Sequence, residues 1–211
     1  MKKKGFIFCL LGLISVASYS QDHSVKKSIE LKAHYSLQRP FYSVNIPLDI
    51  VALPKDWRMR HAIGLDVRYY LGTRWFATYG TSFSQEGGGY SQQRTNANYW
   101  KNAVHLGYSA KQNRKLIFEM YTGLEHSILI NAKFKDKNNG TVENIEEYLS
   151  NSFVSIPLGI GLKSRVGKTY FFTMDVSAHF GTYDASSQDF IKSAQIILPA
   201  FRFGISKFIN R

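Results

Sequence analysis

The stretch GLDVRYYLGTRWFATYGTSFSQEGGGY, residues 64–90, alternates large apolar side chains with small or charged ones. Leu65 and Val67 share one parity, whereas Asp66 and Arg68 share the other. The alternation resumes after a short Gly-Thr-Arg segment. A period of two is typical of β-strands, because successive side chains of a strand point to opposite faces. The stretch therefore predicts two strands joined by a short turn, with one apolar face and one face that carries charges.

The same alternation recurs along the chain and predicts eight strands. They cover residues 28–37, 62–71, 75–84, 100–109, 116–130, 154–163, 170–181 and 197–206. Short connections (72–74, 111–114 and 164–169) alternate with long ones (38–59, 86–98, 131–150 and 184–192). Short turns at one end and long loops at the other are typical of outer-membrane barrels. The first long connection is rich in apolar residues and has room for two more strands, so ten strands is the alternative.

The composition of the two faces indicates which of them points outward. The apolar parity of the eight segments carries no Asp, Glu, Lys or Arg, and a cation at the bilayer midplane costs about 2–4 kcal/mol. The other parity is mostly Gly, Ser, Thr and Ala with few charges, which suits the narrow interior of an eight-stranded tube. A soluble, lipocalin-like barrel would carry many more charges on its water-facing side. We therefore expect an all-β fold, an eight-stranded antiparallel up-and-down transmembrane β-barrel.

Aromatic residues at the strand ends agree with this expectation. Tyr69, Trp75, Tyr108 and Tyr170 adjoin short turns, and Phe83 and Trp100 adjoin long loops. Aromatic girdles at both membrane interfaces are typical of such barrels.

The inward parity carries as many acidic as basic residues. They are Glu30, Asp66, Glu119, Glu125 and Asp175, with Lys32, Arg68, Lys101, Lys163 and Arg202. Buried charges persist only when they are paired. We expect a network made by Glu30, Lys32, Asp66, Arg68, Glu119, Asp175 and Arg202. In it Asp175 lies beside Arg202, and closure of the last strand on the first brings Arg202 towards Glu30. This network predicts a lumen plugged by salt bridges, with a narrow polar path as the alternative.

The N-terminal residues are typical of an export signal. Three lysines precede an apolar run from Phe6 to Val16, and small residues follow before Gln21. We expect residues 1–20 to be a signal peptide and residues 21–211 to form one outer-membrane barrel domain. Cys9 is the single cysteine and falls within the signal. The mature chain is then expected to have no disulfide, no cysteine-ligated zinc site and no cysteine nucleophile.

The charge of the mature chain indicates an anionic partner. Without the three lysines of the signal, 24 of the 27 basic residues remain against 15 acidic ones, a net charge of about +9. Such a balance suits the phosphates of lipopolysaccharide, and export disfavours nucleic acid. The candidate contacts are the basic loop residues Arg39, Lys55, Arg58, Arg60 and Arg94.

The remaining polar motifs do not form a convincing catalytic or metal site. His126 and Ser127 are adjacent, so an extended strand sends them to opposite faces, whereas a nucleophile and its base need hydrogen-bond reach. His34, His105 and His179 share the inward parity, but a zinc site needs them at one height. We expect no catalytic residue, no metal site and no cofactor, with a lipid A deacylase-like hydrolase as the alternative.

Several segments together resemble the small, porin-like outer-membrane β-barrels of Gram-negative bacteria. They are YGTSFSQEGGGY (residues 79–90), FEMYTGLE (118–125), IPLGIGLK (156–163) and FRFGISKF (201–208). The resemblance implies an integral outer-membrane protein but no single activity. We expect a monomer with a structural or surface-interaction role through its long loops, in contact with outer-membrane lipid, lipopolysaccharide or an envelope protein. The alternatives are a lipid A-modifying enzyme and a subunit of a larger envelope or secretion machine.

Overall fold

The structure of the chain is a computed structural model. The structure describes residues 28–39, 41–44, 59–86, 89–90, 93–110, 116–146, 151–166, 169–183 and 194–209. The signal peptide expected at residues 1–20 lies outside them. Within these ranges, no helix is both long and apolar enough to span a membrane.

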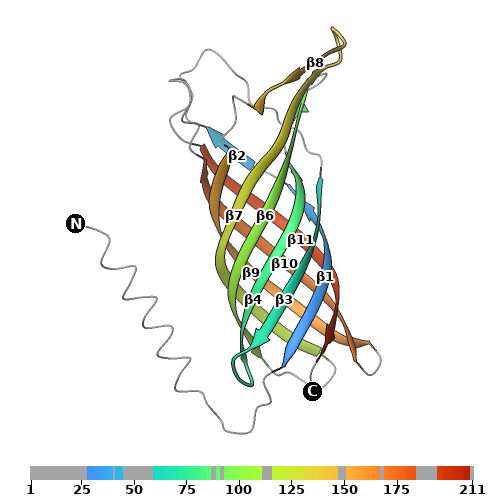
Figure 1. Cartoon of the computed structure of the whole chain (residues 1–211), viewed down its shortest axis with the longest axis vertical. Coiled ribbons are helices and arrows are strands. Elements are labelled where there is room, and N and C mark those ends of the chain that lie inside the picture. The colour runs from blue at the N-terminus through green and yellow to red at the C-terminus, as the bar shows by residue number, and fades with distance from the viewer. Residues whose placement is uncertain are drawn as a thin grey trace, which may run out of the picture.

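Eight long antiparallel strands form a closed tube (Figure 1). They are β1 (Ile29–Gln38), β3 (Arg60–Tyr70), β4 (Trp75–Glu86), β6 (Gln93–Ala110), β7 (Leu116–Asp136), β9 (Ser152–Val166), β10 (Tyr170–Tyr183) and β11 (Ala194–Phe208). Each pairs with the next along the chain, and β1 also pairs with β11, which closes the barrel. The eight-stranded up-and-down prediction is therefore confirmed.

Three further strands are short and lie at the end of the tube opposite the short turns (Figure 1). They are β2 (Phe41–Val44), β5 (Gly89–Tyr90) and β8 (Thr141–Asn144). β2 pairs with the start of β11, β5 with β6, and β8 with β7. They extend the wall at this end without adding strands to the barrel, so the ten-stranded alternative is wrong. We call this the outer end, and the end with the short turns the inner end.

In the described residues, strand continues into two of the expected loops. β6 begins at Gln93 and β7 runs on to Asp136, where a turn at residues 137–140 leads into β8. Gly140 has a φ of 67°, a conformation that suits glycine in such a turn. Val142 to Asn144, which fall in the long connection expected at residues 131–150, belong to β8. The hairpin projects from the outer end of the barrel (Figure 1).

The tube keeps its polar side chains inside and its apolar side chains outside. Along β1, Glu30 and Lys32 are buried, whereas Leu31 between them is 45% exposed. The same alternation holds on β3, where Leu65 is 62% exposed and Asp66 is 6% exposed. A water-soluble fold would show the reverse, since large apolar side chains are normally the buried ones.

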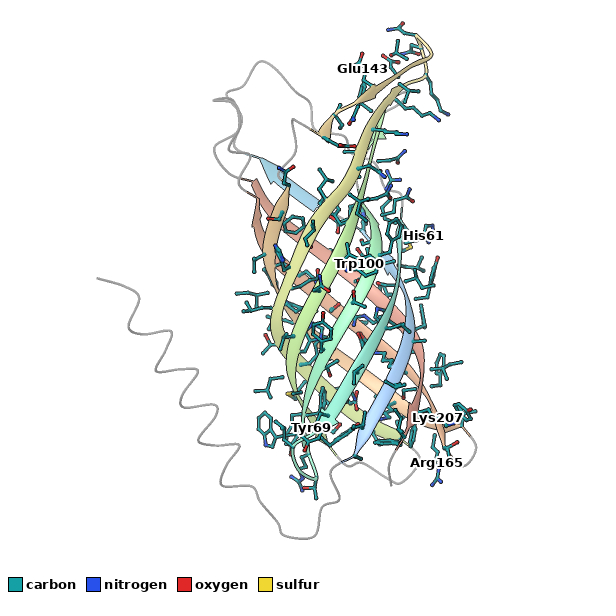
Figure 2. All side chains as sticks on the ribbon, in the orientation of Figure 1. His61, Tyr69, Trp100, Glu143, Arg165 and Lys207 are labelled. Carbon is teal, nitrogen blue, oxygen red and sulfur yellow. The ribbon has the colours of Figure 1, made fainter. Side chains whose placement is uncertain are left out.

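Aromatic rings and cations gather at the inner end. The rings of Trp75 and Tyr108 lie 5.3 Å apart, and Arg74 Nη1 donates to Tyr108 Oη at 2.9 Å. Lys207 Nζ lies 5.5 Å from the ring of Tyr170. Figure 2 shows Tyr69 and Lys207 near this end of the barrel, and His61 towards the other.

Candidate functional site

The interior of the barrel contains many charged side chains. Among the described residues, six acidic and six basic side chains are buried. They are Glu30, Asp66, Glu86, Glu119, Glu125 and Asp175, with Lys32, Arg60, Arg68, Lys101, Lys163 and Arg202. Equal numbers of opposite charges allow the interior to be neutral, which a low-dielectric environment requires.

A first cluster fills the inner part of the lumen. Arg68 Nη1 lies 2.7 Å from Glu119 Oε1, and Lys163 Nζ lies 2.6 Å from Glu30 Oε1. Tyr70 joins the two pairs, because its hydroxyl donates to Glu30 at 2.7 Å and accepts from Lys163 at 3.1 Å and from Arg68 at 3.4 Å. Ser109 Oγ donates to Glu119 at 3.0 Å. Each carboxylate thus meets a cation and a further hydrogen-bond partner.

Aromatic rings surround the cations of this inner cluster. The Arg68 guanidinium lies 3.8 Å from the centre of the Phe76 ring. Lys163 Nζ lies 4.6 Å from the ring centres of both Phe171 and Phe208. Ring faces attract cations, and such contacts gain strength when water is excluded. The rings therefore fill space and hold the cations in place.

A second cluster lies next along the tube. Lys32 Nζ lies 2.8 Å from Asp175 Oδ2, and Tyr121 donates to the other oxygen of Asp175 at 2.8 Å. Arg202 lies between Asp175 and Asp66, at 3.5 Å and 3.8 Å. The Lys32–Asp175 pair joins β1 to β10, two strands that both pair with β11.

A third cluster lies nearer the outer end. Lys101 Nζ lies 2.6 Å from Glu86 Oε1 and 3.2 Å from Glu125 Oε1. His179 Nδ1 lies 3.3 Å from the same oxygen of Glu125. Further out, Arg60 donates to Asn96 Oδ1 at 3.1 Å.

Little space remains between the second and third clusters. The cavity there is lined by His34, Asp66, Gly80, Thr81, Ser82, Lys101, Ala103, His105, Glu125 and Arg202, and its volume is about 10 Å³. A space of this size holds about one water molecule. Glycine makes the close packing possible: a Cβ on Gly159 would lie 2.2 Å from the Tyr121 ring.

The structure places all seven residues of the expected network inside the barrel, and each makes at least one of the ion pairs above. Asp175 lies opposite Arg202 in the register of β10 and β11. The expected approach of Arg202 to Glu30 is wrong, because closure of the barrel pairs Arg202 with Ser36 and Glu30 with Phe208.

Two buried charges were missed by the sequence analysis. Glu86 was assigned to a loop and Arg60 was treated as a surface contact, but they lie at the outer ends of β4 and β3. The signal was present, since Glu86 shares the parity of Ser84, and Arg60 that of Ala62 and Asp66. The inward pattern simply continues beyond the strand ends that we expected.

The structure describes three of the five lipopolysaccharide candidates, Arg39, Arg60 and Arg94. Arg60 is 9% exposed and faces the lumen, so for this residue the expected loop position is wrong. Arg39 follows β1 at the outer end and is partly exposed. Arg94 lies in β6, paired with Gly89. Lys55 and Arg58 lie outside the described residues.

His126 and Ser127 lie on opposite sides of the barrel wall. His126 is exposed on the outside of β7, and Ser127 is fully buried inside. His34, His105 and His179 are all buried in the lumen. Among the described residues, no group of three or more His, Cys, Asp or Glu is arranged to hold a metal ion.

Solved structures share this architecture. Ail of Yersinia pestis matches with a TM-score of 0.51 at 14% identity, covering 88% of this chain and 100% of Ail. Neisserial surface protein A matches with a TM-score of 0.53 at 8% identity, covering 85% of this chain and 96% of that one. The fold is that of a small outer-membrane barrel. No protein-family model matches the sequence, and neither does any curated protein.

Proposed function

We propose that the chain is an integral outer-membrane β-barrel that serves a structural or surface-interaction role, with a lumen plugged by salt bridges. The observation that carries the proposal is the inverted pattern of burial. Large apolar side chains on all eight strands face outward, for example Ile63 at 64% and Ile160 at 55% exposed, while the charges are buried inside. Only a hydrocarbon solvent makes that arrangement favourable.

The proposal is tested by cell fractionation and by gel mobility before and after boiling. The full chain, expressed in a Gram-negative host, should fractionate with the outer membrane. It should run faster on a gel before boiling than after, because the closed barrel resists detergent. A mature chain that stays folded and dissolved without detergent or lipid would overturn the proposal.

The surface role is proposed to include contact with lipopolysaccharide phosphates. Support comes from the charge of about +9 in residues 21–211 and from the position of Arg39 at the outer end. A variant with Arg39, Lys55, Arg58 and Arg94 changed to Gln should co-purify with less lipopolysaccharide. Arg60→Gln is the matched control, because Arg60 faces the lumen. If both variants lost the same amount of co-purified lipopolysaccharide, the result would count against a surface contact.

We propose no catalytic role for the barrel. The separation of His126 and Ser127 by the barrel wall supports this view, because a base must reach its nucleophile. Mass spectrometry of lipid A from cells with and without the gene tests it. Identical lipid A is expected, and a missing acyl chain or phosphate in the expressing cells would overturn the proposal.

A further inference from the structure

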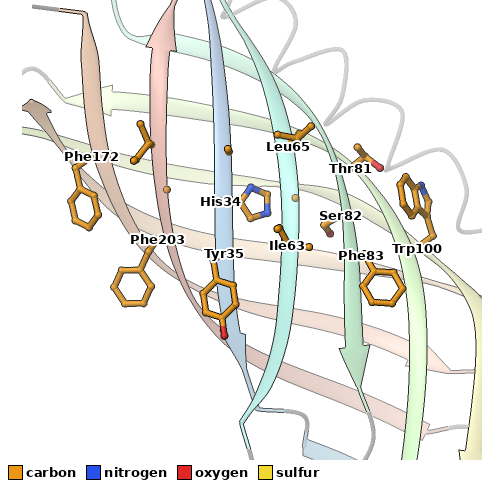
Figure 3. A pocket seen from close by; sticks show the side chains of 14 residues that line it. His34, Tyr35, Ile63, Leu65, Thr81, Ser82, Phe83, Trp100, Phe172 and Phe203 are labelled. Carbon is orange, nitrogen blue, oxygen red and sulfur yellow. The ribbon is translucent and has the colours of Figure 1, made fainter.

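The outer face of the barrel carries a groove. It has a volume of about 670 Å³, and it crosses β10, β11, β1, β3, β4 and β6. This volume falls within the range of small-ligand sites, roughly 300–1,000 Å³. Figure 3 shows Phe172 and Phe203 on one side and Phe83 and Trp100 on the other, with Tyr35 and Ile63 between them.

Small residues create the hollow. Ala33 on β1 faces outward between Ile205 on β11 and Leu65 on β3, and Thr81 on β4 continues the row. The backbones of Gly64 and Gly204 form part of the floor. Around this floor stand large side chains, of which Ile63 and Ile205 are 64% and 60% exposed. The hollow is therefore apolar and is bordered by aromatic rings on two sides.

A polar edge lies on the outer side of the same hollow. Tyr35, which lines the groove, hydrogen-bonds to His61 of the neighbouring strand. Arg39 follows four residues beyond Tyr35, and its main-chain N–H donates to Pro199 O at 3.0 Å. A cation and a histidine thus lie at the outer end of two of the strands that form the groove.

We propose that this groove holds one acyl chain of a lipopolysaccharide molecule, with a lipid A phosphate beside Arg39 and His61. The inference rests on the proposed function, because it needs the outward face to lie in the outer membrane. Lipid tails are as apolar as the groove, so burial of apolar surface alone selects no particular lipid. Selection comes from close packing against the small-residue floor and from the charge at the outer edge.

The test fills the groove and counts the retained lipid. The full mature chain, folded in detergent, is incubated with diphosphoryl lipid A or with phosphatidylglycerol, and native mass spectrometry counts bound molecules. Ala33→Leu and Ala33→Phe should retain at least about threefold less lipid A than the natural chain. Ala178→Leu is the matched control, because Ala178 is another outward-facing alanine, opposite Leu158, and lies outside the groove. Arg39→Gln should weaken retention of diphosphoryl lipid A but not of lipid A without phosphates.

Three outcomes would overturn the inference: equal retention by Ala33→Leu and Ala178→Leu, equal retention of phosphatidylglycerol and lipid A, or no effect of Arg39→Gln. Each variant is also run unboiled and boiled on a gel. A variant that still shows the faster band before boiling has a folded barrel. An unexpected lipid-retention result from a folded barrel then contradicts the binding of lipid A in the groove, but not the proposed outer-membrane barrel.

Discussion

At the scale of single residues, Lys163 shows how strongly the interior charges depend on one another. Its side chain is fully buried, with Nζ 2.6 Å from Glu30, 3.1 Å from the Tyr70 hydroxyl and 4.6 Å from two aromatic ring centres. A buried ammonium group needs such partners, because the loss of hydration would otherwise cost several kcal/mol. Glu30 depends on Lys163 in turn, since its other cation, Arg68, is 3.7 Å away.

Removing one partner of the Glu30–Lys163 pair should lower the free energy of unfolding much more than removing both partners. Lys163→Met leaves the Glu30 carboxylate buried with too little compensation, so we expect the free energy of unfolding to fall by about 3–5 kcal/mol. The double variant Glu30→Gln/Lys163→Met should recover most of that loss, with a coupling energy above about 1 kcal/mol. Urea unfolding of the protein in lipid vesicles measures both values.

A matched lysine controls for the loss of charge alone. Lys207→Met removes a cation that is exposed at the inner end, so its effect should stay within about 0.5 kcal/mol. If the double variant lost as much stability as Lys163→Met and Glu30→Gln combined, Lys163 and Glu30 would not be coupled. The inner cluster would then not depend on this ion pair.

At the scale of strands, the alternation of the sequence was enough to predict the barrel and ten of the twelve buried charges, all except Glu86 and Arg60. Leu65 and Asp66 illustrate why: a lipid face tolerates no charge, so parity alone separates the two sides. The ion-pair partners did not follow from parity. Arg68 on β3 meets Glu119 on β7, two strands that are not neighbours in the sheet. Such contacts depend on the diameter of the tube and on the register of every strand.

The outer part of β7 escaped prediction for a different reason. The register shifts at Asn98 and Tyr99, which pair with Asn131 and Leu129 and leave Ile130 as the extra residue of a bulge. Below the bulge the inward side chains of β7 have odd numbers, such as Ser127; above it they have even numbers, such as the fully buried Ala132. A change of parity inside one strand hides the strand from any test that assumes a fixed period.

The projecting β7–β8 hairpin allows the orientation of the barrel to be tested. Residues 21–211 contain no cysteine, so a single new thiol reports its own position. Asn138→Cys lies in the exposed turn of the hairpin, and Thr73→Cys lies in the exposed turn at the inner end. Outer-membrane barrels keep their short turns on the periplasmic side. A membrane-impermeant maleimide should therefore label Asn138→Cys in intact cells and Thr73→Cys only after the outer membrane is opened.

The pattern of labelling separates the possible arrangements. Labelling of Thr73→Cys but not of Asn138→Cys in intact cells would mean that the barrel is inserted the other way. Labelling of both would mean that the chain does not cross the membrane, which would also remove the basis of the proposed function.

At the scale of the whole molecule, three charge clusters follow one another along the tube, and the proposed function has them plug it together. Lys32 on β1 pairs with Asp175 on β10, two strands away in the sheet, and Lys101 joins Glu86 and Glu125 nearer the outer end. A barrel of about eight strands has an interior that side chains can fill, whereas about sixteen strands leave an aqueous channel. Steady conduction also needs a path with charges of one sign, and here the signs alternate.

The protein in a planar lipid bilayer should therefore pass no stable, step-like current. The charge-neutral variant Glu30→Ala/Arg68→Ala/Glu119→Ala/Lys163→Ala should also stay closed, because it empties only the inner cluster and leaves the other two across the tube. A sixteen-stranded porin in the same bilayer provides the positive control. Stable openings of the natural chain would end the proposal of a plugged lumen. Openings of the fourfold variant alone would mean that the inner cluster by itself closes the tube, and that the clusters nearer the outer end are permeable to ions.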